Sequence, residues 1–146
     1  MTALGTCRVL RPDPDSLDRR EQHHRATFCA RHLPDMTVLV AVRGEVDATN
    51  SRILAAYVER QIAGATRLVL DLTVIEFFGT AGFAALHNVN VICARYGVSW
   101  ALYVGPQVRR FLRVCDPDGL LPIRDSAVQH LDTAPRDRKL LVGGNN

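Results

Sequence analysis

Short apolar runs rich in β-branched residues alternate with stretches of helical periodicity along the middle of the chain. Two of these runs, residues 36–43 and 67–72, are mostly apolar, as in buried strands. Between them, residues 51–63 place apolar side chains at helical spacing and end at Gly64, a residue type that often follows a helix. This alternation predicts an α/β fold.

The same reasoning extends to the rest of the chain. We expect further strands at 26–31, 98–104 and 121–123, an apolar piece at 74–78, and helices at 83–96, 107–114 and 126–131. The first two strands are joined by a short turn and should pair antiparallel, whereas later strands are separated by helices and should pair in parallel. The sequence therefore predicts an α/β sandwich with a mixed β-sheet of four to five strands and about four helices.

Both ends of the chain lack apolar periodicity. Residues 1–22 contain Pro12 and Pro14 among charged residues, and residues 134–146 end in two glycines and two asparagines. We therefore expect a flexible leader over 1–22, one domain over 23–133 and a flexible tail over 134–146. A domain of this length buries a sizeable core without a disulfide or a metal ion.

Charge and hydropathy exclude several classes of function. The net charge is +3, and the excess is spread along the chain instead of forming the basic patch of a nucleic-acid-binding surface. No apolar run reaches the ~18 residues of a membrane span, and residues 1–20 lack the apolar stretch of a signal peptide, so we expect a cytoplasmic protein. We find no catalytic or metal-binding constellation, and predict neither an enzyme nor a cofactor.

Two motifs lie where an expected strand gives way to an expected helix. The first is Gly44-Glu45-Val46-Asp47, and the second is the run DLTVIEFFGTAGFAAL over residues 71–86. Together they resemble the STAS domain of bacterial anti-sigma factor antagonists, whose members typically carry a GE[LI]D element followed by a D-L-S-x-[VI]-x-F-[IM]-D-S-[ST]-G-L-x-x-L element. The resemblance covers about residues 24–132 and implies a STAS-type sandwich.

The resemblance also implies a function and a partner. In this family the domain binds an anti-sigma factor of the kinase-like ATPase fold and thereby releases a sigma factor for transcription. The anti-sigma kinase phosphorylates the hydroxyl residue directly after the motif's aspartate, and the phosphorylated domain no longer binds. The domain itself needs no cofactor, and we expect a monomer or a weak dimer. Transferred to this sequence, the phosphoacceptor is Thr80, and the implied partner-binding residues are Glu45, Asp47, Thr49, Gly79, Thr80, Ala81 and Gly82.

This sequence departs from the family pattern around the acceptor. Gly79 replaces the family's aspartate, Ala81 its second hydroxyl residue and Phe83 its leucine, whereas a hydroxyl remains at Thr80. A phosphate at the start of a helix is tolerated locally, but at an interface its added charge opposes docking. The alternative interpretation is that Thr80 and Asp47 are only helix-capping or turn residues.

A second function stays open on the residues alone. A glycine-containing loop at a helix start is compatible with a STAS signalling module that senses a small anionic ligand such as a nucleotide. Redox sensing through Cys93 and Cys115, which end successive expected helices, is another possibility, although free thiols are the default in a reducing compartment. The arginines Arg109, Arg110 and Arg113 on the short helix form either a solvated face or a contact for an acidic partner.

Overall fold

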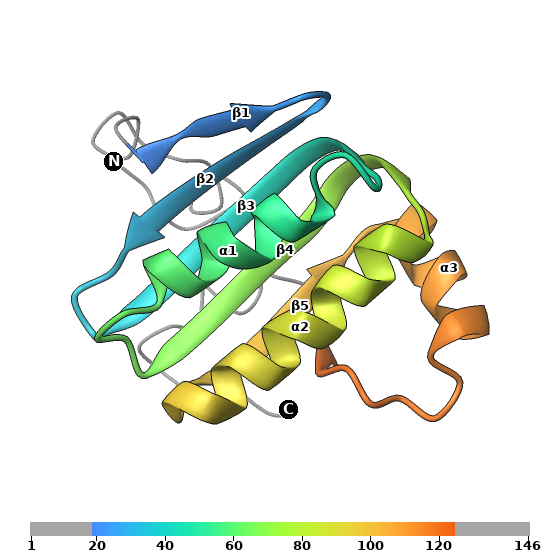
Figure 1. Ribbon diagram of the computed structural model, residues 1–146. Coiled ribbons are helices and arrows are strands. Elements are labelled where there is room, and N and C mark those ends of the chain that lie inside the picture. Colours follow the sequence, from blue (N-terminus) through green and yellow to red (C-terminus); the bar gives the residue numbers. More distant parts are fainter. Residues whose placement is uncertain (1–18, 125–146) are drawn as a thin grey trace.

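A computed structural model describes residues 19–124 of the chain (Figure 1). The described strands are β1 (Glu21–His23), β2 (Ala26–His32), β3 (Thr37–Val46), β4 (Arg67–Phe78), β5 (Ser99–Val104) and β6 (Ile123–Arg124). The described helices are α1 (Ser51–Gln61), α2 (Thr80–Tyr96) and α3 (Pro106–Cys115). The predicted α/β class is confirmed.

All six described strands form one sheet, in which their order in space is their order in the chain. The pairs β1–β2 and β2–β3 are antiparallel, whereas β3–β4, β4–β5 and β5–β6 are parallel. The mixed sheet is therefore confirmed, because each parallel pair has a helix between its two strands in the chain, whereas the antiparallel pairs have none.

The predicted strand count of four to five was too low. Glu21 pairs with Phe28 and Gln22 with Thr27, so the last two residues of the expected leader belong to strand β1. In addition, the apolar pieces at 67–72 and 74–78 are one continuous strand, β4. The helix expected over residues 126–131, and most of the expected leader and tail, lie outside the described residues.

Strand β4 contains two β-bulges, which explain why its sequence looked interrupted. Ala41 pairs with Asp71 but Arg43 pairs with Val74, so two steps along β3 correspond to three along β4. The second irregularity follows between Gly44 and Glu45. At the first bulge the Asp71 carboxylate accepts hydrogen bonds from the Thr73 backbone N–H at 2.8 Å and from its hydroxyl at 2.6 Å. The buried carboxylate thus holds the extra residue in place.

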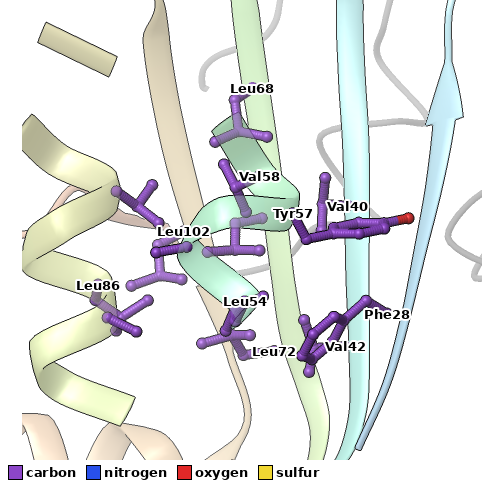
Figure 2. Packing of buried hydrophobic residues seen from close by; sticks show 14 of the residues in the cluster. Phe28, Val40, Val42, Leu54, Tyr57, Val58, Leu68, Leu72, Leu86 and Leu102 are labelled. Atoms are coloured by element: carbon purple, nitrogen blue, oxygen red, sulfur yellow. The ribbon is translucent and has the colours of Figure 1, made fainter. Parts of the chain in front are cut away.

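The three described helices cover one face of the sheet, and the main core lies between them (Figure 1). Figure 2 shows Leu54 and Val58 of α1 packed over β3 and β4, with Leu86 of α2 beside Leu102 of β5. Burying each such side chain contributes about 1.5–3 kcal/mol. No helix in residues 19–124 has the length and apolar character needed to cross a membrane.

The opposite face of the sheet also carries apolar side chains. Leu39 of β3, Val69 of β4 and Tyr103 of β5 form a second, smaller cluster and are each no more than 2% exposed. Leu39 alternates with Val38 and Val40, which face the helices. The buried strand expected over residues 36–43 is therefore confirmed for residues 37–42, whereas Met36 precedes β3 and both Met36 and Arg43 are exposed.

Candidate functional site

The pairing of β3 with β4 brings the two sequence motifs together. Glu45 pairs with Phe77, and Val46 pairs with Phe78. Parallel strands end at the same edge of a sheet, so the loop that begins at Asp47 and the helix start at Thr80 lie side by side. The structure thus joins at one edge all of the residues that the resemblance had marked as partner-binding.

Gly44 is required by the close approach of another turn. Its φ is +94°, and a Cβ at this position would lie 2.1 Å from the carbonyl oxygen of Arg25. The backbone N–H of Glu45 donates to that same carbonyl at 2.9 Å. The Glu45 carboxylate, partly exposed, lies 3.7 Å from the Arg25 guanidinium. The first motif therefore anchors the β1–β2 turn against the end of β3.

The Asp47 side chain shapes the loop between β3 and α1. Its carboxylate accepts hydrogen bonds from the hydroxyl of Thr49 and from the Thr49 backbone N–H at 2.9 Å. These bonds lower the pKa of Asp47 below its usual value, so the carboxylate stays ionised at neutral pH. The Asp47 backbone carbonyl accepts from the N–H of Ser51 at 3.0 Å. Asp47 and Thr49 are both accessible from the solvent, and the charge of Asp47 is held in a fixed orientation.

Asn50 fixes this loop, a role that sequence reasoning missed. Its side chain is completely buried, and its amide donates to the carbonyl of Glu45 at 3.0 Å and to that of His23 at 3.1 Å. Its amide oxygen accepts from the Asp47 N–H at 3.0 Å. Asn50 is the N-cap residue of α1, but its side chain makes no capping bond to the helix. It links three segments instead, and only the fold brings His23 within reach.

The second motif places Thr80 at the first position of α2. Gly79 is the N-cap residue, in extended conformation and without a side-chain capping bond, so the interpretation of Thr80 as a cap is wrong. Thr80 is exposed, Ala81 is partly buried and Gly82 is buried. The first turn of α2 contains no acidic residue. The Thr80 hydroxyl therefore lies in solvent at the positive end of a helix.

Gly82 is required by packing. A Cβ on Gly82 would lie 2.5 Å from Cε1 of the Phe78 ring. The same ring meets Phe111 of α3 edge-on, with the ring centroids 5.8 Å apart. Phe78 therefore packs against the start of α2, which follows it directly, and against the middle of α3. This contact fixes the direction in which the chain leaves β4 through Gly79 and Thr80.

Two exposed apolar side chains extend the site, and neither was singled out from the sequence. Val74 is 55% exposed and Phe77 is 50% exposed, on the face of β4 opposite to the buried Ile75 and Phe78. A Cβ on Gly79 would lie 3.5 Å from the Phe77 ring, so this ring borders the Thr80 junction. The sequence does carry a signal for this. Successive side chains of a strand point to opposite faces, so only one of two consecutive phenylalanines can face the core.

The two cysteines of the redox alternative lie on α2 and α3, outside both motifs. Cys93 of α2 is 1% exposed and Cys115 of α3 is partly buried, and both are free thiols. Burial raises the pKa of Cys93 to about 11, which keeps it neutral at physiological pH. Within residues 19–124, no group of three or more His, Cys, Asp or Glu side chains is arranged to hold a metal ion.

A family model described as STAS domain matches residues 29–132. Among known proteins, the chain is 32% identical over 108 residues to osmosensory protein A of Mycobacterium tuberculosis, with 73% of this chain and 65% of that protein covered. It is 28% identical over 116 residues to anti-sigma-F factor antagonist RsfA of the same species, with 77% and 83% covered. The chain thus spans slightly less than two thirds of osmosensory protein A.

Two solved structures share the fold. An anti-sigma factor antagonist from Mycobacterium paratuberculosis aligns with a TM-score of 0.63 and 24% sequence identity, over 87% of this chain and 100% of that one. The unphosphorylated form of the anti-sigma factor antagonist SpoIIAA aligns with a TM-score of 0.60 and 17% identity, over 74% of this chain and 95% of that one. At this identity the likeness concerns the fold.

Proposed function

The chain belongs to the STAS domain family, and from this premise we propose that it is an anti-sigma factor antagonist. In this role it is a binding protein without catalytic activity. It acts in the cytoplasm, where it binds an anti-sigma factor of the kinase-like ATPase fold and frees a sigma factor for transcription. Two relatives that carry the name anti-sigma factor antagonist, one by sequence and one by fold, support this proposal.

The observation that carries the proposal is the shared edge of the two motifs. The Asp47 loop and the Thr80 junction start from the paired strand ends Val46 and Phe78. One partner surface can therefore contact both. The exposed ring of Phe77 and the side chain of Val74 supply apolar area beside them, which suits the centre of an interface of standard size, about 800 Å² per partner.

We further propose that phosphorylation of Thr80 switches this binding off. The hydroxyl is exposed and lies at a helix N-terminus, where backbone N–H groups tolerate an added phosphate. The phosphate adds about −1.5 to −2 charges in the middle of the proposed interface, directly beside the ionised Asp47 loop. Docking would then bury several uncompensated negative charges. The switch needs no rearrangement of the domain.

The test is a binding titration with a purified anti-sigma factor of the kinase-like ATPase fold from the same organism. Thr80→Glu should weaken binding at least tenfold, whereas Thr80→Ala should stay within threefold of the wild type. Thr66→Glu is the matched control, because Thr66 is exposed just before β4, at the opposite edge of the sheet. Equal affinities for all four proteins would refute the switch, and a wild type that binds no such factor would refute the antagonist role.

A direct phosphorylation assay separates the switch from the binding role. The anti-sigma factor and ATP are incubated with the wild type and with Thr80→Ala, and the phosphate is mapped by mass spectrometry. Phosphate on Thr80 of the wild type, and none on the variant, is the expected result. Because Gly79 stands where the family has aspartate, Gly79→Asp serves as a second substrate. An increased rate for Gly79→Asp would show that the missing acid tunes the reaction.

A further inference from the structure

Helix α3 is held firmly against the sheet by one side. Val108 and Leu112 are buried in the main core, and Phe111 packs edge-on against Phe78. At its N-terminus, a Cβ on Gly105 would lie 2.6 Å from the carbonyl oxygen of Thr73, so the backbone itself touches the first bulge of β4. These contacts fix the orientation of the helix and therefore the side chains that it presents outward.

The outward side of α3 is basic and partly apolar. Arg110 and Arg113 are exposed and Arg109 is partly exposed, and no ion pair within residues 19–124 involves any of the three. Residues 77–115 contain neither aspartate nor glutamate. The nearest acid after them, Asp116, is buried at the end of the helix, and its carboxylate accepts hydrogen bonds from the backbone N–H groups of Leu120 and Leu121. Val114 is 78% exposed beside these arginines, the most of any large apolar side chain in the described part of the chain.

We propose that this surface of α3 (Arg109, Arg110, Arg113 and Val114) binds an acidic segment of a partner protein. Arginine forms paired hydrogen bonds to carboxylates, and Val114 offers a contact for an apolar side chain next to them. That the partner is the anti-sigma factor rests on the proposed function. The contact between Phe111 and Phe78 makes the α3 surface adjacent to the Thr80 junction, so one partner can cover both.

The number and arrangement of the arginines favour an acidic protein segment over an anionic membrane or a nucleic acid as the partner. Attraction to an anionic membrane typically needs clusters of four to eight basic residues, whereas this surface has three. Nucleic-acid interfaces combine several phosphate contacts along a basic stripe, and here the bases occupy less than three turns of one helix. Three guanidinium groups around one exposed apolar side chain match a short acidic segment with an apolar residue.

The first experiment measures association kinetics with the anti-sigma factor for the wild type and the double variant Arg110→Glu/Arg113→Glu. Charge complementarity acts mainly on the association rate, so we expect this rate to fall at least tenfold at low salt and its salt dependence to flatten. The matched control is Arg67→Glu/Arg95→Glu, which makes the same charge change at exposed positions at the start of β4 and the end of α2. Equal effects of both double variants would overturn the proposal, and thermal unfolding confirms that each variant folds.

The second experiment needs no anti-sigma factor and so separates the two proposals. A fluorescent twelve-residue peptide of glutamate with a central leucine is titrated with the wild type and with the same two double variants. Loss of binding in Arg110→Glu/Arg113→Glu alone supports an acidic protein segment as the ligand, even if the antagonist role fails. Binding of the peptide to all three proteins alike would overturn the inference. So would stronger binding of the wild type to phosphatidylglycerol vesicles than to the peptide, since the ligand would then be a membrane.

Discussion

Val46 and Phe78 are register partners, and each is the last residue of its strand. The strands β3 and β4 start together, with Thr37 opposite Arg67, yet β4 is 12 residues long and β3 only 10. The two β-bulges in β4 take up the two extra residues. The bulges thus bring the strand ends level, and the Asp47 loop and Thr80 leave the sheet side by side.

The exposed ring of Phe77 gives the first prediction. Phe77→Thr should weaken binding of the anti-sigma factor by about 10–30-fold, as expected for an aromatic anchor at the centre of an interface. Stability should change little, because the ring is 50% exposed and threonine suits a strand. Val91→Thr is the matched control, since Val91 is 56% exposed but lies three turns along α2 from Thr80. Titration calorimetry measures the binding, and unfolding in urea measures the stability. Equal affinities of Phe77→Thr and the wild type would show that Phe77 lies outside the interface.

The packing of Gly82 under Phe78 gives the second prediction. Gly82→Ala should lower the free energy of unfolding by about 1–2 kcal/mol, because the added methyl group overlaps the Phe78 ring and outweighs the gain in helix propensity. Gly79→Ser is the comparison, since a side chain there meets only ordinary contact at 3.5 Å and serine is a good N-cap. Its stability should stay level or rise by a few tenths of a kcal/mol. Unfolding in urea measures the stability of both variants. A Gly82→Ala variant more stable than Gly79→Ser would contradict the packing argument.

The buried carboxylate of Asp71 gives a prediction about pH. Asp71 is 4% exposed, and burial raises its pKa above 3.8, although the hydrogen bonds from Thr73 oppose this. The native state therefore binds the proton more tightly than the unfolded state. This contribution to stability is present below the unfolded pKa and is lost as pH rises through the native pKa.

Asp71→Asn tests this sign, because asparagine keeps the oxygen that accepts from Thr73 but carries no charge. We expect the variant to be more stable than the wild type at pH 7, on the order of 1 kcal/mol, and this difference to shrink towards pH 3.5. Asp71→Ala removes the hydrogen bonds as well and should be destabilised at both values. A difference between Asp71→Asn and the wild type that grows on acidification would show that the assigned direction is wrong.

The cysteines give the last prediction, which bears on the redox alternative. With a pKa of about 11, roughly one Cys93 thiol in ten thousand is ionised at neutral pH, and its side chain is buried. In the folded protein, Cys115 should therefore react with iodoacetamide at least 100-fold faster than Cys93, as followed by mass spectrometry. In urea the two rates should converge. A Cys93–Cys115 disulfide mapped in the folded protein after mild oxidation would contradict this and support a redox-sensing function.

Much of the architecture followed from the sequence by itself. Alternating periodicity in residues 26–123 predicted the α/β class and the mixed sheet, because local side-chain patterns reflect which faces are buried. The two motifs marked where strands end and helices begin. Strand β1 was missed because Glu21–His23 carries no apolar pattern and is held by pairing with β2.

Only the tertiary structure decided how these pieces meet. The register between Val46 and Phe78, set by two bulges, depends on hydrogen bonds between strands whose partners lie about thirty residues apart in the chain. The burial of Asn50 and its bond to His23 depend on a turn that precedes both motifs. Exposure of Phe77 and burial of Phe78 follow from which face the helices cover. Local sequence determines which elements form, whereas the neighbours of a side chain are set by long-range packing.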